Sequence, residues 1–252
     1  MASHEDINPA ILYFGTPTAL ITTLHPETSA PNIGPMSSIF WLGNHCMLGL
    51  AAFSQTTLNL LSTGTCTISL PSDAEAAHVN RIARTTGSCP VPPPKQSMGY
   101  VHCADKFALG RFTPLPSATV PPPGLAECPV VMEASLVKAF DLFSDSADAR
   151  GAMKAVEVRI QRVRIHPELR LEGFENRVDA DRWRPLIMMF SQFYGLREGR
   201  VRGSRLAEIE EELYRMPGEE ERGGVQRQGQ GQKVDECGGG KVPGRGDVAG
   251  AR

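Results

Sequence analysis

The chain has 252 residues, of which 41% are hydrophobic and 21% charged, and its formal net charge is −2. This balance gives no positive field that would attract nucleic acid or an anionic membrane. The longest apolar runs, such as residues 46–53, are far shorter than the roughly 18 residues that suggest a membrane-spanning helix. The acidic start of the chain also lacks the basic and apolar regions of a secretory signal. We therefore expect a soluble, cytoplasmic protein that binds neither nucleic acid nor membrane.

The cysteines argue against two familiar kinds of site. The six cysteines, at positions 46, 66, 89, 103, 128 and 237, include no C-x-x-C pair, which disfavours a zinc ribbon and a thioredoxin-type redox centre. Two His-Cys pairs, His45-Cys46 and His102-Cys103, raise a metal hypothesis. Adjacent residues of a strand point to opposite faces, however. We predict no metal site.

The first half of the chain is typical of short strands with minor helices. Thr56 is predicted to cap a helical turn that ends near Gly64, and Asp73 to cap a helix that carries Val79 and Ile82. The strand candidates are rich in β-branched or apolar residues and are separated by Pro, Gly and Asn. They cover residues 19–23, 39–42, 46–53 and 65–70. This spacing favours a barrel or a sandwich.

The second half continues the β pattern after two proline-rich passages. Residues 89–94 and 114–123 are predicted to be extended, helix-free surface connectors. Strands are expected at residues 128–137 and 155–165. Along the second of these strands the apolar residues change from even-numbered to odd-numbered positions. We therefore predict a β-bulge, one extra residue in the strand, that returns Val163 and Ile165 to the core face.

The two ends of the chain are expected to lie outside the main body. We assign residues 1–10 to an N-terminal arm and residues 11–200 to the body. Within residues 201–216, Ser204 precedes Leu206, Ile209 and Leu213 at helical spacing, which predicts an amphipathic C-terminal helix. Residues 217–252 contain no Leu, Ile, Met or aromatic residue and much Gly, which predicts a disordered tail.

Several common catalytic motifs are absent from the sequence. It contains no G-x-S-x-G elbow, no H-E-x-x-H helix, no phosphate-binding P-loop and no G-x-G-x-x-G fingerprint after a strand. We therefore predict no catalytic side chain of the triad or paired-carboxylate kind.

The segment Pro31–Ser38 is followed after one strand by Ser54–Asn59, and this pair of segments carries a resemblance. Further matching segments are Thr16–Thr23, Leu70–Ser72, Asn80–Gly87 and Asp105–Phe107. Together they resemble the flavin-reductase-like family, which includes the flavin reductase partners of two-component monooxygenases. The motifs occur in the expected order and span roughly residues 10–200.

The resemblance implies a mainly β fold with minor helices, an FMN-binding split β-barrel that forms an intertwined homodimer. It further implies that residues 32–38 line the isoalloxazine ring and that the turn at residues 54–59 receives the phosphate. The candidate cofactor-binding residues are Asn32, Gly34, Pro35, Met36, Ser37, Ser38, Ser54, Gln55, Thr56, Thr57, Asn59 and Arg84.

The chemistry of these residues is compatible with that role. Short hydroxyl and amide donors at a helix N-terminus suit a phosphate, and Asn59 can brace the turn. The alternative is that the Ser and Thr residues only cap a short helix, while Ser37 and Ser38 lie on a polar strand face. Arg84 and Lys106 either add positive charge near a phosphate or nicotinamide nucleotide, or are solvated surface groups.

The expected activity is hydride transfer from NADH or NADPH to the N5 atom of FMN, with a flavin-dependent monooxygenase as a candidate partner for the reduced flavin. Two alternatives stay open. One is an enzyme with tightly bound FMN that acts on a small organic substrate, for example in secondary metabolism. The other is a flavin-binding module without turnover.

Overall fold

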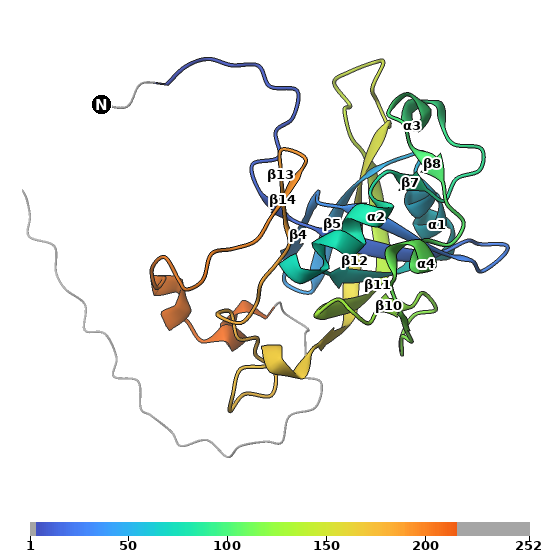
Figure 1. The fold of residues 1–252 in the computed structure, drawn as a ribbon. Coiled ribbons are helices and arrows are strands. Elements are labelled where there is room, and N and C mark those ends of the chain that lie inside the picture. Colours follow the sequence, from blue (N-terminus) through green and yellow to red (C-terminus); the bar gives the residue numbers. More distant parts are fainter. Residues whose placement is uncertain (1–3, 216–252) are drawn as a thin grey trace, which may run out of the picture. The chain divides into compact units, whose positions relative to one another are not determined.

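A seven-stranded antiparallel sheet dominates the computed structural model, which describes residues 4–215 (Figure 1). The strand order is β3-β2-β6-β11-β12-β5-β4. In chain order the strands are β2 (Ala19–Leu24), β3 (Pro31–Met36), β4 (Ile39–Leu42), β5 (His45–Ala51), β6 (Thr65–Leu70), β11 (Val130–Asp141) and β12 (Met153–Ile165). The mainly β prediction is confirmed. The predicted tail at residues 217–252 lies outside the described residues.

The connection between β3 and β4 curls this sheet into a barrel. These strands stand at opposite ends of the strand order, yet only Ser37 and Ser38 separate them in the chain. A link of two residues spans only about 10 Å, so the two ends of the sheet must lie close together. The backbone amide of Gly49 on β5 donates a 2.7 Å hydrogen bond to the carbonyl of Ser38, which fixes this junction.

Alternate residues of the strands face two separate cores. Ile21, Ile68 and Val156 are fully buried inside the barrel. Leu20, one residue from Ile21, instead packs on the outer face with residues of the helices, including Ile82. This alternation follows from the two-residue period of a strand.

The helices are few and short, and Figure 1 shows them on one side of the sheet. They are α1 (Gln55–Thr63), α2 (Ala76–Ile82), α3 (Pro93–Ser97) and α4 (Lys106–Gly110). The predicted end of α1 is confirmed, since Gly64 has a left-handed φ of 71°. Both predicted N-caps are wrong by a small shift. Ser54 rather than Thr56 caps α1. The helix that carries Val79 and Ile82 is α2, and its N-cap is Glu75 rather than Asp73. Ser72 caps the preceding 3-10 turn η1 (Asp73–Glu75), because Glu75 completes a capping box with it.

The first proline-rich passage is not helix-free, whereas the second is, as predicted. Residues 93–97 form α3, because proline is tolerated in the first turn of a helix, where its missing N–H has no intrahelical acceptor. In the second passage β9 (Pro114–Leu115) pairs with β10 (Gly124–Leu125), which directly follows the passage. The remaining short strands are β1 (Thr16–Pro17), β7 (Thr85–Thr86), β8 (Val101–His102), β13 (Ile187–Met189) and β14 (Gln192–Tyr194).

The predicted bulge in β12 is present. Arg162 pairs with Glu133 and Ile160 with Ala134, so Gln161 is the extra residue in the ladder. Ile165 packs against the barrel core as expected. Val163 does not, since its side chain is 57% exposed. Beyond residue 159, β12 has no pairing with β5, so Val163 lies where the barrel wall has ended.

The predicted C-terminal helix is wrong. Residues 205–208 and 211–214 form two separate 3-10 turns, η3 (Arg205–Glu208) and η4 (Glu211–Tyr214). Ile209 between them is extended, and Leu206 and Leu213 are exposed. An amphipathic helix gains most of its stability from burying its apolar face, and among residues 4–215 no surface covers these side chains. Another 3-10 turn, η2 (Pro167–Leu169), precedes this region.

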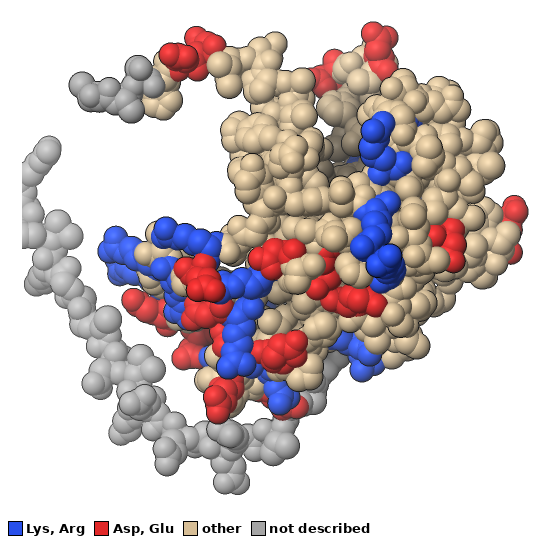
Figure 2. Space-filling model, viewed as in Figure 1, with Lys and Arg blue, Asp and Glu red and all other residues tan. Residues whose placement is uncertain are grey.

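Charged side chains of both signs gather over the C-terminal part of the described chain, while the rest of the face seen in Figure 2 is largely uncharged. Surface ion pairs join Arg177 to Glu210 and Arg200 to Asp181. Such exposed pairs contribute little stability each. No helix within residues 4–215 has the length and apolar character needed to cross a membrane.

Candidate functional site

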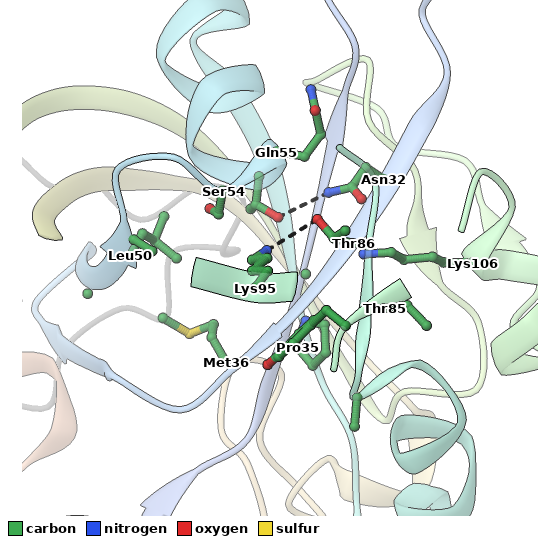
Figure 3. A pocket seen from close by; sticks show the side chains of 17 residues that line it. Asn32, Pro35, Met36, Leu50, Ser54, Gln55, Thr85, Thr86, Lys95 and Lys106 are labelled. Carbon is green, nitrogen blue, oxygen red and sulfur yellow. Dashed lines mark hydrogen bonds between the residues drawn. The ribbon is translucent and has the colours of Figure 1, made fainter. Parts of the chain in front are cut away.

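A cavity of about 180 Å³ opens where β3, β5 and the start of α1 meet the segment that contains β7 (Figure 3). Its wall combines backbone and side chains from five separate parts of the chain. The lining residues are Asn32, Gly34, Pro35, Met36, Gly49, Leu50, Ala51, Ser54, Gln55, Thr56, Ala83, Thr85, Thr86, Gly87, Lys95, Tyr100 and Lys106. Seven of the twelve residues predicted from the sequence are among them.

The turn at the start of α1 supplies a cluster of short donors. Ser54 is the N-cap, and its Oγ accepts a 3.2 Å hydrogen bond from the backbone amide of Thr57. Ser54, Gln55 and Thr56 line the cavity. The positive end of the helix dipole and the unpaired amides of the first turn make such a position favourable for an anion.

Thr57 and Asn59 support this turn from behind and do not line the cavity. The hydroxyl of Thr57 donates a 2.8 Å hydrogen bond to the carbonyl of Ala51. Asn59 is fully buried. Its Nδ2 donates to Oγ1 of Thr23, and its Oδ1 accepts from Nε2 of Gln55 at 2.7 Å. The bracing role expected for Asn59 agrees with this geometry.

The strand β3 forms a second wall, and close packing fixes it to α1. Nδ2 of Asn32 donates a 3.0 Å hydrogen bond to Oγ1 of Thr56, whereas Oδ1 of Asn32 is buried without a partner among residues 4–215. A Cβ atom at Gly34 would lie 2.2 Å from Oγ1 of Thr56. A Cβ atom at Gly87 would lie 2.4 Å from Oδ1 of Asn32. Glycine at both positions keeps this side of the cavity open.

Two lysines bring positive charge to the cavity. Lys106 is only 3% exposed, and its Nζ donates a 2.8 Å hydrogen bond to the carbonyl of Ile33. Burial, together with repulsion from Lys95, lowers the pKa of Lys106 to about 8. Nζ of Lys95 lies 3.3 Å from Oγ1 of Thr86, and burial lowers the pKa of Lys95 as well. Among residues 4–215 neither lysine forms a salt bridge with a carboxylate.

Three residues predicted for the site lie elsewhere. Ser37 and Ser38 form the link between β3 and β4, where Ser38 packs against Gly49. Arg84 is exposed, and its guanidinium donates to the carbonyl of Met98. Neither the two serines nor Arg84 is part of the cavity wall.

Several cavity residues were not predicted as binding residues. Thr85, Thr86 and Gly87 lie in a segment that the resemblance already marked, so a signal was present for them. Lys106 was considered only as a weak source of charge. Lys95 and Tyr100 follow the proline run, and nothing in the local pattern indicates that this segment reaches the cavity.

The sequence profile described as "Flavin reductase like domain" matches residues 11–197. The chain belongs to the flavin reductase-like family. A relative from Bacillus subtilis (strain 168), the uncharacterized protein YdfE, is 34% identical over 192 residues, which are 76% of this chain and 89% of that protein.

Solved structures of flavin reductase-like proteins share the fold. Flavoredoxin of Desulfovibrio vulgaris (Miyazaki F) superposes with a TM-score of 0.65 at 19% identity, over 81% of this chain and 100% of that one. Nitrilotriacetate monooxygenase component B from Bacillus cereus superposes with a TM-score of 0.61 at 18% identity, over 79% of this chain and 99% of that one. The split-barrel fold predicted from the sequence is confirmed.

Proposed function

We propose that this protein is an FMN-dependent oxidoreductase in which hydride passes from NADH or NADPH to flavin bound in the cavity beside α1. Membership of the flavin reductase-like family supports a flavin-related redox activity. The observation that carries the proposal is the cavity itself, which joins a donor-rich helix start and two lysines to an apolar wall.

The polar end of the cavity fits the phosphate of FMN. Ser54 and Thr56 offer hydroxyl groups at the N-terminus of a nine-residue helix. The ammonium group of Lys106 is buried against the same wall without a carboxylate partner among the described residues. Short donors combined with positive charge are the groups that hold phosphates in proteins.

The other end of the cavity fits an aromatic ring system. Pro35, Met36 and Leu50 give it an apolar surface, and Gly34 and Gly49 allow close approach of the backbone. Oδ1 of Asn32, which has no partner within residues 4–215, can accept a hydrogen bond from a ring N–H.

When bound, FMN would supply the hydride-accepting chemistry, so the side chains are left to bind, orient and shield. In this account the wall around Met36 and Leu50 excludes water from one face of the ring, and Asn32 sets its orientation. No side chain is required as a general acid or base, which agrees with the lack of a triad or paired-carboxylate motif in the sequence.

Oxidation of NADH and NADPH tests this function, measured by loss of absorbance of the reduced nicotinamide with and without added FMN. We expect oxidation that depends on FMN and saturates with it, and that Gly87→Ala abolishes. The substitution Gly203→Ala serves as the matched control, because a Cβ atom there meets nothing within 4 Å. No oxidation with any flavin would contradict the proposal.

A second candidate is an enzyme that retains FMN and reduces a small organic substrate. The segment that follows the first proline-rich passage favours it, since its residues Lys95 and Tyr100 border the cavity and could enclose a second ligand. Protein that purifies yellow and oxidises NADPH only when an organic acceptor is present would support this candidate. Release of reduced FMN to a separate monooxygenase would support the first.

We further propose that two copies of the chain associate through the edge of the barrel at β4. Phe40 and Leu42 are 53% and 72% exposed, although they alternate with core-facing Ile39 and Trp41. An edge strand with exposed large apolar side chains favours association. Light scattering should give twice the mass of the chain, and the double variant Phe40→Ser/Leu42→Ser should give the monomer mass.

A further inference from the structure

The cavity is smaller than the ligand proposed for it requires. Its volume is about 180 Å³, whereas pockets that hold small molecules and cofactors in proteins usually measure about 300 to 1,000 Å³. A flavin nucleotide therefore enters fully only after part of the wall has moved. The part that moves also determines how the ligand enters and leaves.

Most of the wall belongs to the barrel and to α1. β3 and the start of α1 are joined by a hydrogen bond between two buried side chains. Residues 89–100, which we call the α3 loop, contribute Lys95 and Tyr100 to the wall and differ from these elements. No residue of the α3 loop is buried, and no residue from 83 to 106 belongs to either core cluster. A segment with few buried apolar contacts opens at a low free-energy cost.

Arg84 joins the α3 loop to the body of the protein. Its Nη2 donates a 2.8 Å hydrogen bond to the carbonyl of Met98. The other contact is longer, since Nζ of Lys95 lies 3.3 Å from Oγ1 of Thr86 (Figure 3). Within residues 4–215 these are the two hydrogen bonds between the α3 loop and other parts of the chain. Loss of the Arg84 bond would therefore remove the shorter of two attachments.

The α3 loop depends on these attachments for its local structure. α3 itself has five residues, and isolated helices shorter than about 12 to 15 residues are marginal in water. The amides of Gly99 and Tyr100 donate to carbonyls within the loop, at 2.9 and 3.0 Å, so these amides report whether the loop is formed. A ladder of β7 with β8 holds the two ends of the loop together, which confines opening to the loop (Figure 1).

We propose that the α3 loop is a lid over the cavity and that Arg84 is the positioning residue that latches it shut. The inference rests on the proposed flavin binding and adds how access to the cavity is controlled. Arg84 does not line the cavity, so it acts through the loop. A lid that opens seldom retains FMN between turnovers, whereas a lid that opens often releases reduced flavin to another protein.

A latch has a kinetic signature that differs from that of a binding residue. If the ligand enters and leaves only while the lid is open, the open fraction scales both the association and the dissociation rate constant. Loss of the latch favours the open lid with and without ligand, so both rate constants rise together and the dissociation constant changes little. Loss of a residue that contacts the ligand instead raises mainly the dissociation rate constant.

Stopped-flow fluorescence of FMN measures both rate constants for the wild-type protein, Arg84→Met, Arg84→Lys and the surface control Arg81→Met. We expect Arg84→Met to raise both rate constants about 3- to 10-fold, the effect of losing one solvent-exposed hydrogen bond, and to change the dissociation constant by less than about two-fold. Arg84→Lys keeps a donor, so its rate constants should lie between those of Arg84→Met and the wild type. Arg81→Met should match the wild type, because Arg81 is an exposed residue of α2.

Hydrogen exchange, followed by mass spectrometry, tests the latch without flavin. The amides of Gly99 and Tyr100 should exchange about 3- to 10-fold faster in Arg84→Met than in the wild type, while peptides from β2 and β6 keep their protection. Unchanged exchange of these two amides would overturn the latch, whether or not flavin binds.

The two measurements separate the lid from the proposed function. A higher dissociation rate constant with an unchanged association rate constant in Arg84→Met would overturn gating and leave flavin binding intact. A wild-type protein that binds no FMN would overturn the proposed function, and hydrogen exchange would still decide whether Arg84 latches the α3 loop.

Discussion

Nδ2 of Asn32 on β3 donates a 3.0 Å hydrogen bond to Oγ1 of Thr56 in the first turn of α1. Both side chains are buried, so the bond fixes the helix start against the strand at a position that lines the cavity. The same amide leaves its Oδ1 without a partner among the described residues. One side chain thus positions the turn and also offers an acceptor to a ligand.

Substitution of Asn32 should separate flavin binding from folding. Asn32→Ala removes both the bond to Thr56 and the free acceptor, and we expect the affinity for FMN to fall about 10-fold or more, because each lost buried hydrogen bond costs about 1 to 3 kcal/mol. Asn59→Ala is the comparison, since Asn59 braces α1 through Thr23 and Gln55. It should lower the melting temperature with a smaller effect on the affinity of the folded protein. The reverse order of effects would contradict these roles.

Gly87 should tolerate no side chain. A Cβ atom there would lie 2.4 Å from Oδ1 of Asn32, so Gly87→Ala must displace the amide or fill the cavity. We expect loss of detectable FMN binding by fluorescence titration, while the far-ultraviolet circular dichroism spectrum is retained. The control Gly203→Ala should bind FMN like the wild type. Normal FMN affinity in Gly87→Ala would exclude this wall from the binding site.

The buried lysine should leave a signature in the stability of the flavin-free protein. The pKa of Lys106 is about 8 in the folded chain, against an ordinary value of 10.5, so the unfolded chain binds more protons between these pH values. The free energy of unfolding therefore gains up to about 3 kcal/mol from this group as pH rises through that window. Lys106→Met lacks the buried charge, so we expect it to be more stable than the wild type. Denaturant titrations should show this difference in the free energy of unfolding decrease as pH rises. An advantage independent of pH would contradict the assignment.

Glu133 should stabilise the loop that contains residues 117–123. Burial alone would raise the pKa of Glu133, but hydrogen bonds from Thr119 and Ala118 to its Oε2 lower it below the ordinary value. Its stabilising contribution is thus present at neutral pH and is lost as pH falls through the folded-state pKa. Glu133→Gln should reduce the free energy of unfolding at neutral pH by about 1 to 3 kcal/mol. A variant as stable as the wild type in urea would contradict this role.

The sequence predicted the parts of the fold that local patterns determine. Alternation marked β12 and even its bulge, because burial on one face leaves a two-residue period. The amphipathic spacing of Leu206 and Leu213 was misleading, since periodicity shows what a helix could bury and not whether a surface exists to cover it. The proline run was misread at α3 because proline restricts a helix only beyond its first turn.

The cavity could be predicted only in part for a related reason. Asn32, Ser54 and Thr56 lie in contiguous motifs that the family resemblance identifies. Lys95 reaches the cavity through the path of the chain after the proline run, and no local pattern encodes that path. Arg84 and Lys106 were both considered as sources of positive charge and only Arg84 was named as a binding residue, yet Arg84 is exposed and Lys106 is buried in the wall.

A crystal structure of the protein grown with FMN tests the central claim most directly. The account predicts electron density for one flavin in the cavity, with its phosphate within hydrogen-bond distance of Ser54 and Thr56 and of Nζ of Lys106, and its ring against Pro35 and Met36. Density for FMN at another site, with this cavity filled only by water at saturating FMN, would contradict the account.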